Sequence, residues 1–171
     1  MKVRRRPGLV LALGNDLLGD DGVGLAAARA LRPEFSERVD IVETSEAGLA
    51  LLEWLEGYKR ALLLDSIMTG RHRPGTALEF SPDDFRAVSA PSPHYAGLPE
   101  AFCLAQQLGI LFPEKIRILA MEIENSLVIR EGLSQSVSQA LPGFVERARR
   151  ILSGWESEDG AENGKNGMDA S

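Results

Sequence analysis

Residues 8–24 read GLVLALGNDLLGDDGVG, and they carry the strongest structural signal in the chain. Gly8–Leu13 is a continuous apolar run that ends at Gly14, which is typical of a parallel strand buried on both faces. A turn rich in glycine and aspartate follows, and apolar residues then recur at helical spacing until Pro33: Val23, Ala27, Ala30 and Leu31. A strand, a turn and a helix in this order predict the first unit of an α/β sheet.

Apolar strands and helical segments continue to alternate along the chain. Four further strands are expected: Val39–Glu43, Ala61–Leu64, Ala77–Phe80 and Ile116–Met121. Ala77–Phe80 follows a proline–glycine turn and should run in the opposite direction to the others. The alternation predicts an α/β fold over residues 1–152. We expect a single three-layer domain with a mostly parallel, twisted sheet of about five strands and helices on both faces.

Three further helices are expected: Ala47–Trp54, a helix from Pro99 onward, and Ser134–Leu152. The helix from Pro99 should carry an apolar stripe formed by Phe102, Ala105 and Leu108. Pro142 should bend or break the last of them. Residues 153–171 lose most apolar content and are rich in Gly, Glu, Asp and Asn. Such a segment buries too little surface to offset its ordering entropy, so a disordered polar tail is expected there.

The amino-acid composition and net charge argue against some classes of binding partner. The chain has 171 residues, a net charge of −6 and one cysteine, Cys103. Nucleic-acid binders cluster Lys and Arg against phosphates, so this charge argues against one. A single cysteine permits no intramolecular disulfide and does not indicate an oxidising compartment. The apolar run near the start is too short for a signal peptide or a membrane span. We therefore expect a cytoplasmic protein that binds neither nucleic acid nor membranes.

Three residues of metal-binding types lie where an α/β sheet binds ligands, at the carboxyl ends of strands. Asp21 lies in the turn after the first strand, Asp65 ends the apolar run ALLLD, and His94 lies in a proline-rich loop. Two carboxylates and one imidazole suit borderline divalent metals, and three protein ligands leave positions open for a substrate. Taken singly, each residue has a simpler interpretation: aspartates that cap a helix or a loop, and a solvated histidine.

The glycine-rich turn also invites comparison with a dinucleotide-binding fingerprint, with Glu43 as the ribose ligand. The second glycine of that pattern, where backbone approaches pyrophosphate, is Asp16 in this chain. Asp20 and Asp21 would also repel phosphate. A nucleotide-binding oxidoreductase is therefore the weaker alternative. A calcium-binding loop is also excluded, because Ala27 occupies the position at which such a loop has a bidentate glutamate ligand.

The sequence contains no Gly-x-Ser-x-Gly nucleophile elbow. Cys103 shares the expected helix stripe with Phe102, which favours a buried, inert thiol. Ser92 lies two residues before His94, but no further residue completes a catalytic triad. The sequence therefore points to metal chemistry rather than to a side-chain nucleophile, and the catalytic group itself is not identified.

Three strings, GNDLLGDDGVG, ALLLD and SPHYAGL, resemble the hydrogenase maturation endopeptidase family over about residues 9–152. The resemblance implies a metal-dependent endopeptidase that removes a C-terminal extension from the precursor of a nickel–iron hydrogenase large subunit. It aligns Asp21, Asp65 and His94 with the family's metal ligands. The nickel would be supplied by the substrate, and other divalent metals could substitute. A non-catalytic chaperone that inspects nickel loading stays open as an alternative.

The resemblance has one departure, at residues 43–46, where Glu-Thr-Ser-Glu replaces an aspartate-glycine-glycine-threonine stretch of many members. Since this stretch follows a strand at the ligand edge, we expect it to shape substrate choice. Substrate contacts are expected at the same edge: Gly14, Asn15, Glu46 and Gly48. Asp16 and Asp20 are candidates to position a water molecule.

Overall fold

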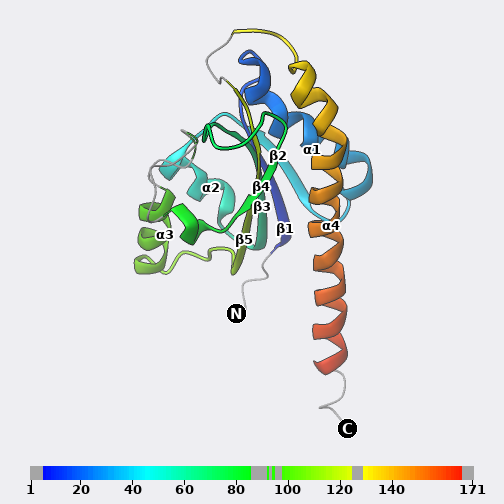
Figure 1. Cartoon of the computed structure of the whole chain (residues 1–171). Helices are drawn as coiled ribbons and strands as arrows, with labels where there is room; N and C mark the ends of the chain where they lie inside the picture. The colour runs from blue at the N-terminus through cyan, green and yellow to red at the C-terminus, as the bar shows by residue number, and fades with distance from the viewer. Residues whose placement is uncertain (1–5, 86–91, 93, 95–97, 125–128, 167–171) are drawn as a thin grey trace.

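The computed structural model describes residues 6–85, 92, 94, 98–124 and 129–166 (Figure 1). Its strands are β1 (Arg6–Leu13), β2 (Asp40–Thr44), β3 (Tyr58–Ile67), β4 (Ala77–Phe80) and β5 (Lys115–Glu122). Its α-helices are α1 (Val23–Phe35), α2 (Leu51–Leu55), α3 (Leu98–Gln107) and α4 (Gln135–Asn166). Short 3₁₀ helices are η1 (Gly19–Gly22), η2 (Gly48–Ala50) and η3 (Pro82–Phe85).

The five strands form one sheet in the order β2-β1-β3-β5-β4. Strands β2, β1, β3 and β5 run parallel, and β4 pairs with β5 in the antiparallel sense. The predicted fold and the reversed direction of β4 are therefore confirmed. The carboxyl ends of the four parallel strands lie at one edge of the sheet, the upper edge in Figure 1.

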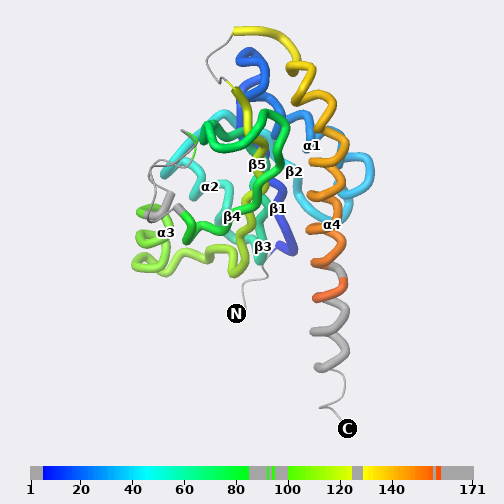
Figure 2. Tube along the Cα trace, in the orientation of Figure 1, coloured from blue at the N-terminus to red at the C-terminus, as the bar shows by residue number. Residues whose placement is uncertain are grey.

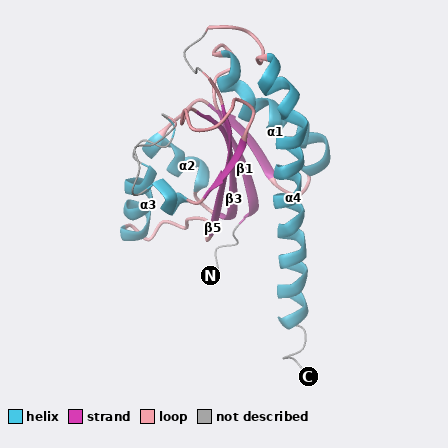
Figure 3. Cartoon of the chain, viewed as in Figure 1, coloured by secondary structure: helices cyan, strands magenta, loops and turns pink. Residues whose placement is uncertain are grey.

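Helices cover both faces of the sheet (Figure 3). On one face, Val10, Leu62 and Leu119 pack with residues of α1 and α4. On the other face, Leu11 and Leu63 pack with residues of α2. Residues 9–13 are all 0% exposed, because the central strand β1 is covered on both sides. This double burial explains why the strand reads as a continuous apolar run.

Gly14 and Gly24 allow the turn after β1 and the start of α1 to lie close to neighbouring backbone atoms. Gly14 has φ +143°, and a Cβ there would lie 2.2 Å from the Asp21 carbonyl oxygen. A Cβ on Gly24 would lie 2.4 Å from the Leu64 carbonyl oxygen and 2.8 Å from that of Leu13. The start of α1 therefore packs directly on the backbone of β1 and β3. This close approach places Asp21 beside the end of β3.

Several helix boundaries differ from the prediction. Helix α1 continues through Pro33, and α4 continues through Pro142. An internal proline costs a helix about 3 kcal/mol, but the flanking residues Phe35 and Phe144 are each 1% exposed, and this burial offsets the cost. The helix expected at residues 47–54 is instead η2 followed by α2, because Gly48 adopts a positive φ of 59°.

The disordered tail expected from residue 153 disagrees with the structure as far as Asn166, because α4 runs unbroken to that residue; residues 167–171 lie outside the described residues. Figure 2 shows the first turns of this helix beside the sheet and α1, and Figure 1 shows its last turns extending beyond the lower edge of the sheet. Trp155 is 7% exposed and belongs to the core on the α1 side. The buried Arg60 donates to the Trp155 carbonyl oxygen at 2.8 Å and pairs with Glu158 at 3.3 Å. The periodicity of apolar residues did not predict this contact, because Trp155 is a single apolar residue among polar ones.

No described helix is long and apolar enough to cross a bilayer.

The buried stripe of α3 also differs from the prediction. Ala101 and Ala105 are 0% exposed, whereas Leu108, which was expected on the stripe, lies past the end of the helix and is 65% exposed. Cys103 is exposed, so the expectation of a buried thiol was wrong. Phe102, which was expected on the stripe, is half-buried and packs against the core on the α2 side, with its ring centroid 4.9 Å from that of Phe112, whereas Cys103 and Leu104 are exposed.

Candidate metal centre

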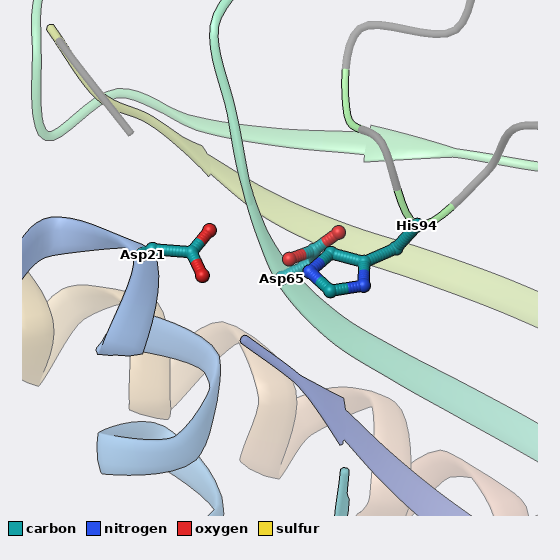
Figure 4. A group of neighbouring side chains, drawn as sticks. All are labelled: Asp21, Asp65 and His94. Atoms are coloured by element: carbon teal, nitrogen blue, oxygen red, sulfur yellow. The ribbon is translucent and has the colours of Figure 1, made fainter. Parts of the chain in front are cut away.

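The structure brings Asp21, Asp65 and His94 together (Figure 4). Each offers a ligand atom, and these atoms all lie within 4.8 Å of one another. Asp21 comes from η1, Asp65 from β3 and His94 from the segment before α3. The three residues are 5%, 0% and 7% exposed, so the cluster is nearly closed to solvent rather than lying in an open cleft.

Ser66 joins the two carboxylates of the cluster. Its backbone N–H donates to Asp65 Oδ1 at 2.7 Å, and its hydroxyl donates to Asp21 Oδ1 at 2.9 Å. Successive side chains of a strand point to opposite faces, so Ser66 faces α1 while Asp65 faces the other layer. The Asn15 N–H donates to Asp21 Oδ2 at 2.8 Å, and the Ser92 hydroxyl donates to Asp65 Oδ2 at 2.8 Å. Each carboxylate is thus held by two donors.

The His94 ring is oriented by a backbone carbonyl. Its Nδ1 lies 2.9 Å from the Glu46 oxygen, which can only accept a hydrogen bond. In the neutral imidazole Nδ1 therefore carries the proton, and Nε2 keeps its lone pair. Figure 4 shows the second ring nitrogen turned toward Asp65. The Glu46 side chain accepts a hydrogen bond from the Trp54 indole, which holds the loop that provides this carbonyl. The arrangement leaves Nε2 available to a metal ion.

The electrostatics of the cluster also favour a cation. Burial, with a smaller contribution from the nearby Asp21 charge, raises the pKa of Asp65 to about 7. His94 and the hydrogen bonds from Ser92 and Ser66 act in the opposite direction but do not outweigh burial. A buried carboxylate is costly without a compensating positive charge. A divalent ion would supply that charge, and its binding would displace the proton.

The distances between the three ligand atoms fit a metal ion if the ligands move slightly closer together. Oxygen and nitrogen ligands lie about 2.1 Å from zinc-like ions, so opposite ligands are at most roughly 4.2 Å apart. The separations in the cluster extend to 4.8 Å, so an ion would draw the ligands together by less than about 1 Å. Two carboxylates with one imidazole are donors that suit borderline divalent metals.

Asp16 and Asp20 lie outside the cluster, so neither is placed to position water there. Asp16 pairs with Arg29 at 2.7 Å. Asp20 accepts a hydrogen bond from the Ser134 N–H at 2.6 Å and pairs with Arg130 at 3.4 Å. None of Asp16, Asp20 and Asp21 caps α1, because the N-cap of that helix is Gly22 and has no side-chain cap bond.

Glu43, the ribose ligand in the dinucleotide alternative, is engaged by two arginines. It pairs with Arg29 at 2.6 Å and with Arg32 at 3.0 Å. The same Arg29 also holds Asp16, the residue that replaces the second glycine of the fingerprint. A ribose would have to displace both ion pairs, which weakens the oxidoreductase alternative further.

The residues expected to contact substrate fall into two groups. Gly14 and Asn15 line a cavity of about 290 Å³ at the carboxyl ends of β1 and β2, and Asn15 also holds Asp21. Glu46 is used to orient His94, and Gly48 is a turn residue with positive φ.

Ser66, Ser92 and Trp54 were not recognised from the sequence as parts of the site. Proximity to Asp65 and His94 was a signal for the two serines. No sequence signal marked Trp54, whose role depends on how its helix meets the loop before it.

Comparison with known proteins identifies the family of this chain. A family model described as hydrogenase maturation protease matches residues 25–151, a span that includes Asp65 and His94 and begins just after Asp21. The hydrogenase 2 maturation protease of Escherichia coli (strain K12) is 27% identical over 148 residues, covering 84% of this chain and 89% of that protein. The hydrogenase expression/formation protein HupD of Rhizobium leguminosarum bv. viciae is 28% identical over 152 residues, covering 86% and 74%.

Solved structures agree as well. The hydrogenase maturating endopeptidase HybD from Escherichia coli superposes with a TM-score of 0.71 at 27% identity, covering 86% of this chain and 92% of that one. The [NiFe] hydrogenase maturation protease HybD from Thermococcus kodakarensis gives 0.65 at 25% identity, covering 85% and 98%. The resemblance noted from the three sequence strings is therefore confirmed. The chain is an endopeptidase that belongs to the hydrogenase maturation protease family.

Proposed function

We propose that this endopeptidase removes the C-terminal extension of a nickel-loaded precursor of a nickel–iron hydrogenase large subunit. In this proposal Asp21, Asp65 and His94 bind the nickel ion that the precursor carries. The observation that carries it is the convergence of the three ligand atoms within 4.8 Å in a family of hydrogenase maturation proteases. The proposal includes the cytoplasm as the compartment, because the single cysteine offers no intramolecular disulfide.

The donor set suits an ion that arrives with its own ligands. Three protein donors leave coordination positions open, and softer thiolates of the precursor would fill them. Thiolates should dominate the affinity for nickel, so the three residues recognise the ion rather than store it. The free protein should therefore bind divalent metals weakly. Other divalent ions could occupy the same donors in isolation.

The residues around the cluster hold its donors in place for this recognition. The Glu46 carbonyl keeps His94 Nε2 turned toward the carboxylates, and Ser66 and Ser92 orient Asp65. When bound, the ion would polarise the scissile carbonyl or lower the pKa of a water molecule. The cavity beside Asn15 lies at the same edge of the sheet and offers a place for the side chain of a substrate residue.

The test is cleavage of nickel-loaded and nickel-free precursor by the purified protein. Wild type should cut only the nickel-loaded form. His94→Ala and Asp65→Ala should fold but lose at least about tenfold in cleavage rate, since even residues that only orient metal ligands typically cost that much. His72→Ala is the matched control, because His72 is the second histidine of the chain and is exposed.

Two results would contradict the proposal. Equal processing of nickel-free precursor would show that the ion is not recognised. A wild-type rate in His94→Ala would show that the cluster has no part in cleavage. A metal-reading chaperone without activity would bind the nickel-loaded precursor and never shorten it.

A further inference from the structure

Exposed apolar side chains gather at the edge of the sheet that holds the metal centre. The described residues include seven exposed large hydrophobic side chains, and four of them lie in the segments that follow the parallel strands. We call these four the apolar rim: Leu17, Leu49, Met68 and Ile129. They follow β1, β2, β3 and β5 respectively, and they are 62%, 57%, 48% and 85% exposed.

The rim lies at the same edge as the cluster because parallel strands end there together. Leu17 lies between Asn15, which holds Asp21, and Asp21 itself. Leu49 is three residues after Glu46, which orients His94, and Met68 is three residues after Asp65. These three rim residues therefore lie close in sequence to a residue of the cluster or to one that orients it, and Ile129 follows the last parallel strand at the same edge.

The segments that carry Leu17 and Ile129 are hydrogen-bonded to each other. Leu18 forms a parallel bridge with Arg130, in which the Arg130 N–H donates to the Leu17 carbonyl oxygen at 3.1 Å. The Gly19 N–H donates to the Arg130 carbonyl oxygen at 2.8 Å. Figure 1 shows the two segments together at the upper edge, in blue and yellow.

A buried carboxylate strengthens this connection. Asp20 is 7% exposed and accepts hydrogen bonds from the Ser134 N–H and from Arg130. These bonds hold together the two backbone segments that carry the strongly exposed side chains of Leu17 and Ile129. Fixing them in advance lowers the entropic cost of covering them with a partner.

We propose that the apolar rim docks an apolar surface of the hydrogenase precursor around the segment that is cleaved. This inference rests on the proposed function and names the surface by which that substrate is held. The cluster residues are at most 7% exposed, so a substrate group can reach them only if the precursor comes against the surrounding loops. The surface that meets those loops must cover the rim, and covering apolar side chains favours association.

The experiment separates docking from cleavage with matched serine variants. Leu17→Ser and Ile129→Ser remove rim side chains that touch none of the cluster. Leu108→Ser is the control, because Leu108 is 65% exposed, close to the 62% of Leu17, and lies after α3 away from the rim. For each protein the KM and kcat for nickel-loaded precursor are measured. The Kd for nickel-free precursor is measured by calorimetry, so that metal contacts do not contribute.

Each rim variant should raise KM and Kd at least about fivefold and leave kcat within about twofold, as expected when a buried leucine-sized contact is lost. The control should match wild type in all three. Rim variants with unchanged Kd and KM would overturn the inference. So would loss of wild-type self-association in the rim variants during sedimentation, because a second copy would then be the occupant. If wild type failed to cleave at all, the proposed function would fail, whereas the Kd comparison would still decide docking.

Discussion

Asp65→Asn should stabilise the metal-free protein above neutral pH and should lower the rate of precursor cleavage at least about tenfold. The Asp65 side chain is 0% exposed, and burial raises its pKa from the ordinary 3.8 to about 7. Between these two values the folded state holds a proton that the unfolded state releases. The free energy of unfolding of wild type therefore falls as pH rises through this window, and the stabilisation is lost once the pH exceeds about 7.

The magnitude follows from the size of the shift. Each unit of pKa corresponds to about 1.4 kcal/mol, so the full shift is worth about 4 kcal/mol at alkaline pH. The asparagine side chain is nearly isosteric and stays neutral. Its oxygen can accept from the Ser66 N–H as Asp65 does, and its amide can donate to the Ser92 hydroxyl. Wild type and variant should thus be close in stability near pH 4 and differ by several kcal/mol near pH 8.

The assay is urea unfolding of both proteins at about pH 5, 6, 7 and 8 with a chelator present, so that no metal contributes. The difference between the two free energies of unfolding should grow by about 1.4 kcal/mol per pH unit below pH 7 and then level off. Glu37→Gln is the control, since it makes the same chemical change at an exposed position and should run parallel to wild type. Parallel curves for wild type and Asp65→Asn would refute the reasoning. Cleavage of nickel-loaded precursor by the variant should fall at least about tenfold.

Three further changes test other parts of the structure. Truncation after Gly154 removes the buried Trp155 and should cost about 3–5 kcal/mol in urea unfolding, whereas truncation four residues later should be nearly neutral. Gly24→Ala should lower stability by about 1–3 kcal/mol, because the added methyl group meets backbone oxygens of two strands; a gain would show that the helix can move away. Trp54→Phe removes the donor to Glu46 and should reduce cleavage about two- to fivefold with little change in thermal stability; an unchanged rate would show that the loop needs no such support.

The class of fold and the candidate metal ligands could be predicted from the amino-acid sequence. Residues 9–13 form a continuous apolar run because both faces of their strand are covered, and such a run marks a central parallel strand wherever it lies. Asp21 and Asp65 could be selected because the ends of parallel strands share one edge, which makes position along the chain informative about position in space. His94 was added by residue type and by the family resemblance.

The contacts that complete the site could not be predicted in this way, because they join segments that are distant in the sequence. The alternation of Asp65 and Ser66 across β3 allows one serine to hold both carboxylates, and this depends on where Asp21 lies in space. The bond from His94 to the Glu46 carbonyl joins loops 48 residues apart, and no local pattern predicts it. The helical continuation through Pro142 likewise reflects packing that outweighs local preference. Short-range patterns report propensity and burial, whereas contacts between distant segments depend on angstrom-scale packing that forms only when the chain folds.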